Sequence, residues 1–267
     1  MDIASLREKI RRIEGAHAGL GAEGRKRPAG WRFGVPDMDQ ALPGGSLSLE
    51  ALHDFTPDRN VNVPAVSSLV HFLLPRLPRR GPIVWCRMVH DNTEYGRPYG
   101  PGLISGGLDP ARLVFVSLNK AASMAFALEE ALKMPALAAV IGEGRPLGFT
   151  ESRRLSLIAQ KSRVPCLFVN TRESGEASAA VTRWRAGPVP GPAGPYDDRL
   201  PGKPAWSLEL TRSRGGRTGS WKVFWDDDTH SFAPLPASGA RTFRGRRLQA
   251  PVALDVAPDR AASRITG

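Results

Sequence analysis

The feature that most constrains the fold is an alternation of short apolar runs with helical patterns between residues 51 and 170. The apolar runs predict strands at 51–55, 83–88, 113–117, 138–141 and 166–169, and the intervening patterns predict helices at 64–77, 120–133 and 150–162. Strands separated by helices pair in parallel and are covered on both faces, so we expect an α/β fold with a mainly parallel sheet. Thr150 is the expected N-cap of the last helix.

The pattern changes after residue 170. Arg183 to Arg185 alternate as in a strand, and the proline- and glycine-rich stretch 187–204 is typical of a loop. Two more alternating runs follow, with the apolar members Trp206, Leu208, Leu210, Trp221, Val223 and Trp225. They predict an antiparallel hairpin at one edge of the sheet, with at least two of the three tryptophans in the core.

Both ends of the chain are expected to lie outside a core at 31–232. Residues 1–30 predict a short amphipathic helix and a glycine-rich linker, with an apolar stripe formed by Ile3, Leu6, Ile10 and Ile13. A helix of about 13 residues is marginal alone, so the stripe must dock on a partner, a second copy or its own core. Residues 233–267 predict a basic, disordered tail.

Composition is that of a soluble protein, and we expect it in the cytoplasm. The 267 residues, 41% of them hydrophobic, suffice for one sizeable core. No apolar run reaches about 18 residues, and the N-terminus is charged rather than signal-like, which predicts no membrane contact. The two cysteines, Cys86 and Cys166, lie in apolar runs and are expected to be buried thiols.

The net charge of +11 is concentrated at the ends of the chain. Basic and acidic residues number 7 and 4 in residues 1–30, 16 and 14 in 31–182, and 14 and 8 in 183–267. Basic ends favour contact with a polyanion or an acidic partner, although they also serve solubility alone.

The loop 56–63 lies between a predicted strand and a predicted helix, where a phosphate loop would be. A phosphate loop needs glycines, whose backbone N–H groups wrap the phosphates, and a lysine that neutralises them. This loop has neither. The Gly202-Lys203 pair precedes Pro204 in a proline-rich loop and does not replace it. The alternative is an ordinary connection that never held phosphate.

An ordered series of short motifs carries a family resemblance over roughly residues 30–232. The motifs are Phe33-Gly34, 42–47 (LPGGSL), 51–55 (ALHDF), 84–86 (VWC), 99–103 (YGPGL), 107–113 (GLDPARL), 129–132 (EEAL), 138–143 (AAVIGE), 150–155 (TESRRL) and 221–230. In this order they resemble the ImuA family, RecA-like accessory proteins of bacterial DNA-damage-induced mutagenesis. The resemblance implies a RecA-like core.

The resemblance also directs attention to Glu143. RecA-type ATPases carry an acidic residue near this strand end that handles metal and water. One carboxylate without a lysine does not organise a magnesium triphosphate, so we expect a structural or interface role for Glu143. The five histidines are dispersed, no cysteine–histidine spacing suits zinc, and Asp226 to Asp228 predict a solvated turn. We therefore expect no catalytic, cofactor-binding or metal-binding residues, and no enzyme.

The leading hypothesis is a non-enzymatic adaptor in SOS-induced translesion DNA synthesis. The resemblance implies contact with ImuB and, through ImuB, with an error-prone DnaE-type polymerase; RecA, weak DNA contact and self-association are further options. Candidate partner-binding residues are Ile3, Leu6, Ile10, Ile13, Arg241, Phe243, Arg244, Arg246 and Arg247, and candidate nucleic-acid contacts are Arg212, Arg214 and Arg217. The alternatives are a SulA-like cell-division inhibitor and an atypical ATPase.

Overall fold

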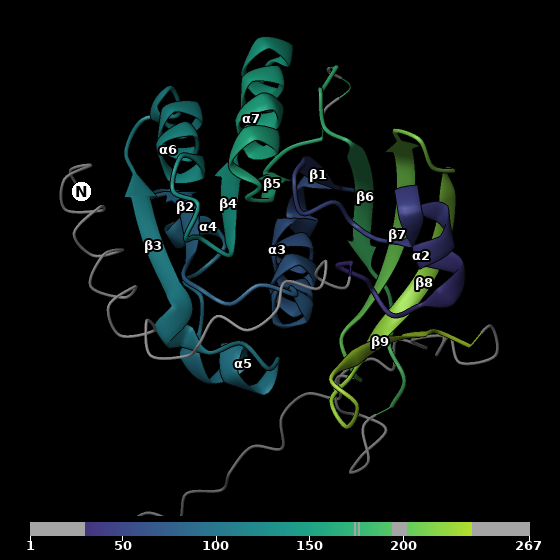
Figure 1. The fold of residues 1–267 in the computed structure, drawn as a ribbon. Coiled ribbons are helices and arrows are strands. Elements are labelled where there is room, and N and C mark those ends of the chain that lie inside the picture. The colour runs from purple at the N-terminus through teal and green to yellow at the C-terminus, as the bar shows by residue number, and fades with distance from the viewer. Residues whose placement is uncertain (1–29, 174, 176, 194–201, 237–267) are drawn as a thin grey trace, which may run out of the picture.

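The structure is a computed structural model that describes residues 30–173, 175, 177–193 and 202–236. Within these residues nine strands form one sheet in the order β3-β2-β4-β5-β1-β6-β7-β8-β9 (Figure 1). The strands are β1 (Leu52–Pro57), β2 (Ile83–Met88), β3 (Leu113–Leu118), β4 (Ala139–Gly144), β5 (Cys166–Asn170), β6 (Thr182–Pro188), β7 (Ala205–Ser213), β8 (Gly219–Asp226) and β9 (Ser231–Pro234).

Strand direction divides the sheet in two. In the order of the sheet, the six strands β3, β2, β4, β5, β1 and β6 pair in parallel. The strands from β6 through β7 and β8 to β9 pair antiparallel. This confirms the mainly parallel sheet of an α/β fold and the C-terminal antiparallel hairpin, which is β7 and β8. Strand β9 was not expected and extends the antiparallel part by one strand. Figure 1 shows β3 and these antiparallel strands at opposite ends of the sheet.

Helices cover the parallel strands on both faces. They are α3 (Val63–Leu73), α4 (Asp91–Glu94), α5 (Gly100–Ser105), α6 (Ser123–Leu132) and α7 (Phe149–Ser162). Helix α2 (Pro36–Ala41) instead lies beside β8 in the antiparallel part of the sheet (Figure 1). Alternate residues of β2 show the two faces, because Trp85 packs in the core that contains α3 and Cys86 packs in the core that contains α6 and α7. None of the helices in the described ranges has the length and hydropathy to cross a bilayer.

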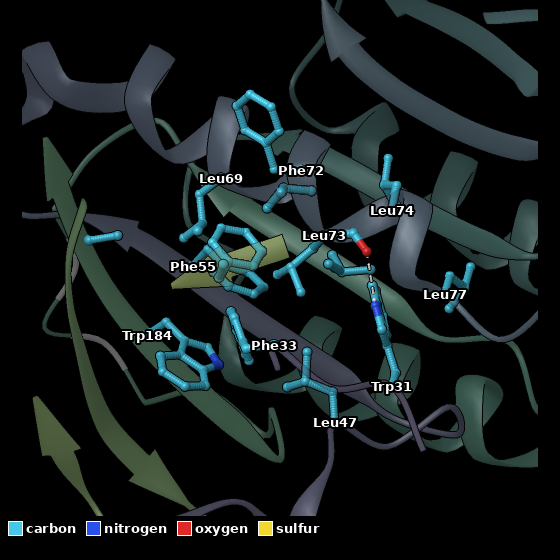
Figure 2. Close-up of a cluster of buried hydrophobic side chains, with 14 of the residues drawn as sticks. Trp31, Phe33, Leu47, Phe55, Leu69, Phe72, Leu73, Leu74, Leu77 and Trp184 are labelled. Atoms are coloured by element: carbon cyan, nitrogen blue, oxygen red, sulfur yellow. Dashed lines mark hydrogen bonds between the residues drawn. The ribbon is translucent and has the colours of Figure 1, made fainter. Parts of the chain in front are cut away.

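The larger core joins α3 to the antiparallel strands and the segment before α2. Phe33, Phe55 and Trp184 form its centre, with ring centroids 5.1 Å apart for Phe33 and Trp184 (Figure 2). Trp31 is fully buried, and its indole Nε1–H donates to the Leu73 carbonyl at 3.0 Å. This hydrogen bond holds Trp31, near the start of the described residues, against the last turn of α3.

The second core packs α6 and α7 on the other face. A Cβ on Gly142 of β4 would lie 2.7 Å from the Phe168 ring and 2.8 Å from Leu128 of α6. Real Cβ atoms do not approach so closely, so the glycine allows this close packing of helix on sheet.

Two sequence expectations need correction. Thr150 is not the N-cap of α7: Gly148 is, and its N–H donates to the Glu151 carboxylate at 2.9 Å. The helix expected to run to residue 77 is α-helical only to Leu73 and continues as a 3₁₀ turn over Leu74–Arg76. Pro75 lies in this turn and has no N–H to continue the α-helical bonds.

Candidate functional site

The loop after β1 is closed by its own polar contacts. The Asp58 N–H donates to the Ala186 carbonyl at 2.8 Å, and the Asp58 carboxylate accepts from the Asn62 side-chain amide at 2.7 Å. Asn62 is the N-cap residue of α3, so this carboxylate is held at the start of the helix. A helix N-terminus favours an incoming anion, but here a side-chain anion already lies beside it.

Neighbouring strands reinforce this closed loop. The Asn60 side-chain oxygen accepts from the Glu173 N–H at 2.9 Å. A Cβ on Gly187 of β6 would lie 2.2 Å from the Asp58 carboxylate, so β6 passes directly against it. The loop therefore lacks the glycines and lysine of a phosphate loop. Its Asp58 N–H and the side chains of Asp58, Asn60 and Asn62 are already engaged in hydrogen bonds within the protein.

Glu143 lies near the end of β4 and is fully buried. Its Oε1 accepts from Arg87 Nη2 of β2 at 3.0 Å, and its Oε2 accepts from the Trp85 indole N–H at 3.2 Å. Arg87 also donates to the Gly96 carbonyl at 3.2 Å. These contacts tie β2, β4 and the segment after β2 together, which agrees with the structural role expected for Glu143.

Burial raises the pKa of the Glu143 carboxyl, and the Arg87 charge and the two hydrogen bonds offset part of that rise. Sequence reasoning missed Arg87 as the partner. The only signal that could have found it is the register of β2 and β4, which sets Arg87 opposite Glu143.

An apolar cavity of about 350 Å³ opens between α3 and the segment 95–105. Trp85, Arg87 and Glu143 line it from the sheet, so the buried ion pair forms part of its wall. Ser67 and Ser68 line it from α3.

A second, more polar cavity of about 360 Å³ lies at the carboxyl ends of the parallel strands. It includes Asp91, which follows β2, Arg145, which follows β4, and Arg172, which follows β5. Adjacent strands β2 and β4 connect to opposite faces here, a position where open α/β sheets commonly bind ligands. Asp91 is 2% exposed, and its Oδ2 has no hydrogen-bond partner within the described residues. Burial raises the pKa of this carboxyl.

The hairpin arginines are exposed but differ in their contacts. Arg212 Nη1 donates to the Ser178 carbonyl at 2.7 Å, and Arg214 Nη2 donates to the Ala179 carbonyl at 3.4 Å. Arg217 is tied through its backbone, whose N–H donates to the Ala41 carbonyl at 2.9 Å. The structure thus gives Arg212 and Arg214 a part in holding the hairpin.

The tryptophans behind these arginines agree with their expected places. Trp206 and Trp225 are buried and Trp221 is half-buried, which confirms at least two of the three in the core. The candidate partner-binding residues lie outside the described residues: Ile3, Leu6, Ile10, Ile13, Arg241, Phe243, Arg244, Arg246 and Arg247.

The acidic run at the end of β8 is a turn with an internal cation. Lys203 Nζ lies 2.5 Å from Asp226 and 3.5 Å from Asp228, and Asp226 also accepts from the Thr229 hydroxyl. Lys203 is therefore an ion-pairing residue here. In the described part of the chain no group of three or more His, Cys, Asp or Glu side chains is placed to hold a metal.

The sheet order defines an α/β protein with a mainly parallel sheet and an antiparallel extension, and the loop after β1 contains neither glycine nor lysine. No family model matches the chain. The chain is 34% identical over 220 residues to protein ImuA of Caulobacter vibrioides strain NA1000 / CB15N, and equally to that of strain ATCC 19089 / CIP 103742 / CB 15. The match covers 76% of this chain and 86% of each relative. The chain belongs to the ImuA family.

Proposed function

We propose that this protein is a non-enzymatic, RecA-like adaptor in SOS-induced translesion DNA synthesis and that it binds ImuB. The observation that carries the proposal is the closed loop after β1 in a chain of the ImuA family. Asp58 occupies the start of α3 where a phosphate loop would present backbone N–H groups, and Glu143 is neutralised by Arg87. The N-terminus of α3 and the Glu143 carboxylate, which would contact a nucleotide and its metal in an ATPase, instead make contacts within the fold. This supports a degenerate nucleotide site.

The working surfaces are then the ends of the chain. The core 31–182 carries nearly balanced charge, whereas both ends are basic. The tail segment 241–248 combines arginines with Phe243 and Leu248 and is proposed as the ImuB contact, which would link the protein to a DnaE-type polymerase. The stripe of Ile3, Leu6, Ile10 and Ile13 also needs an apolar surface to dock on, which a partner, a second copy or the chain's own core would supply. Contacts with RecA and weak contacts with DNA are further parts of the proposal.

Co-purification with ImuB tests this function. Deletion must begin after residue 236, because strands β6 to β9 run from Thr182 to Pro234 and carry buried Trp184, Trp206 and Trp225. We expect full-length protein to retain ImuB, and deletion of 237–267 to lose it.

Charge reversals locate the contact more finely. Arg246→Glu with Arg247→Glu is expected to weaken ImuB retention at least tenfold. Arg153→Glu with Lys161→Glu is the matched control, since both side chains are exposed on α7. Equal retention by both double variants would move the contact away from the tail, and failure of the full chain to bind would refute ImuB as the partner.

One observation favours a second candidate, nucleotide binding by an atypical site. The cavity with Asp91, Arg145 and Arg172 lies at the carboxyl edge of the sheet, and Asp91 Oδ2 is buried there without a hydrogen-bond partner among the residues that the structure describes. Calorimetry with ATP and Mg²⁺ separates the two functions. The adaptor predicts no saturable binding, whereas saturable binding that Arg145→Ala removes would establish the atypical site.

A further inference from the structure

The apolar cavity between α3 and α5 is a groove with small and large side chains along α3. Ser67, Ser68, His71 and Phe72 line it from α3, Trp85 lines it from the sheet, and Tyr99 and Leu103 line it from the segment that contains α5. We call it the α3–α5 groove. The lining residues leave about 350 Å³ open, and the two serines contribute only small side chains to it. A cavity of about 150 Å³ admits benzene, so the groove takes about two branched apolar side chains.

The described residues leave apolar surface open at this groove. Tyr99, which lines the groove, is 72% exposed. The Ser67 hydroxyl oxygen is buried and has no hydrogen-bond partner among the described residues. Large apolar side chains exposed beside a concave apolar surface are typical of a binding groove.

We propose that the α3–α5 groove is the docking site of the N-terminal stripe of the same chain, formed by Ile3, Leu6, Ile10 and Ile13. The stripe needs an apolar partner, because a helix of this length gains its stability from packing. The groove supplies apolar surface and room for side chains of this size. The assignment holds whether or not ImuB is the partner, and it leaves the basic tail as the proposed ImuB contact.

The point where the chain enters the fold favours docking on the same molecule. Trp31 is bonded to the Leu73 carbonyl, and His71 and Phe72, which line the groove, directly precede Leu73 along α3. A glycine-rich chain as long as residues 14–29 has a root-mean-square end-to-end distance of about 20–24 Å. A tether of that reach gives an effective concentration on the order of millimolar, which favours the chain's own stripe over that of a second molecule.

Charge placement agrees with this arrangement. At about 100° per residue, Asp2 and Glu14 fall about 60° from the centre of the stripe, closer than any basic residue of the segment. Among the residues that line the groove, Arg97 is exposed, and the one acidic member, Glu143, is already paired with Arg87. In the proposed arrangement the acidic flank of the stripe would lie toward Arg97, and its basic face toward solvent.

Disulfide trapping in the full-length chain tests the proposal. The native Cys86 and Cys166 are fully buried and burial raises the pKa of both thiols, so introduced cysteines react selectively. We expect Ile10→Cys with Ser68→Cys to form an intramolecular disulfide under mild oxidation, at least tenfold faster than Arg12→Cys with Ser68→Cys. Arg12 lies on the opposite face of the segment, which makes this pair the matched control.

Further variants decide between the remaining outcomes. Ser105→Cys is a second, exposed groove position for use if Ser68→Cys alters the fold. Adding Leu6→Asp to the trapping pair is expected to slow the disulfide at least tenfold. Equal rates in the trapping and control pairs, or no disulfide at either groove position, would overturn the proposal. Disulfide-linked dimers from a mixture of the single-cysteine variants would overturn docking within one chain in favour of a second copy.

Discussion

Arg87 Nη2 lies 3.0 Å from Glu143 Oε1, and the two side chains are 7% and 1% exposed. They come from adjacent parallel strands, β2 and β4, at paired register positions. A buried ion pair costs desolvation that its attraction only partly repays, so it stabilises less than its geometry suggests. Removing one partner, however, leaves the other charge buried without compensation.

Single and double substitutions at this pair are therefore expected to differ. Arg87→Met should lower the free energy of unfolding by about 3–5 kcal/mol, because Glu143 would remain buried without its cation. Arg87→Met with Glu143→Leu should recover most of that loss. Urea unfolding followed by circular dichroism measures both. A double variant as unstable as the single one would show that the cost comes from lost packing.

Acid destabilisation through His53 follows from its burial. His53 is fully buried, its Nε2–H donates to the Ser48 carbonyl at 2.8 Å, and its Nδ1 lies 2.8 Å from the Thr182 hydroxyl, placed to accept from it. Burial lowers the pKa of His53 from 6.5 to about 4. Between these values the unfolded chain binds a proton that the folded chain does not, so stability falls as pH decreases from about 6.5 to about 4, by about 3 kcal/mol.

The measurement is urea unfolding at several pH values, compared between the native chain and His53→Gln. The comparison isolates His53, because the carboxyl groups with a raised pKa are present in both proteins. The slope between pH 6.5 and 4 should be smaller in His53→Gln than in the native chain. An NMR titration that showed the His53 ring protonating near pH 6.5 would contradict the prediction.

Trp31 is expected to stabilise the fold both through its hydrogen bond and through the burial of its large apolar side chain. Trp31→Ala should cost about 3–5 kcal/mol of unfolding free energy, because it opens a cavity beside Leu73 and Leu74. Trp31→Phe should cost less, although it leaves the buried Leu73 carbonyl without its donor, a loss of about 1–3 kcal/mol. Thermal unfolding of the two variants checks the order, which would be wrong if phenylalanine were the more damaging substitution.

The cysteines provide a test of the second core. Burial raises the pKa of the Cys86 thiol to about 12 and also raises that of Cys166. Because the thiolate is the reactive form, a thiol reagent should label neither residue in the native protein at pH 7, and both in urea. Rapid labelling of one thiol without denaturant would show that this core opens more readily than its packing indicates.

Substitutions of Arg217 and Arg212 are expected to distinguish an effect on nucleic-acid binding from an effect on stability. Arg217→Ala should change stability by less than about 0.5 kcal/mol and reduce the salt dependence of single-stranded DNA binding by about one ion. Arg212→Ala should instead cost about 1 kcal/mol, because its guanidinium bonds the Ser178 carbonyl. Identical DNA binding by the native chain and Arg217→Ala would remove Arg217 as a contact.

Local patterns of apolar residues in the sequence predicted most of the strands and helices. The apolar runs around Ile83 and Cys166 and the alternation around Trp206 placed strands to within a few residues, because side-chain period is a short-range property of the chain. Helix boundaries were predicted less accurately where backbone hydrogen bonding sets them. Pro75 lacks the N–H that would continue α3, and the Gly148 N–H caps α7. Strand β9 was missed because four residues with a proline give little periodicity.

The sequence by itself determined the alternation of strands and helices, the edge hairpin, the loop without glycine or lysine, and the ordered motifs of the ImuA family. Tertiary structure alone decided that Arg87 meets Glu143, that Asp58 is enclosed by β6 and the N-cap of α3, and that Ser67 and Ser68 of α3 line the same groove as Tyr99. These are contacts between segments far apart in the chain. They depend on strand order and register, which local periodicity does not encode.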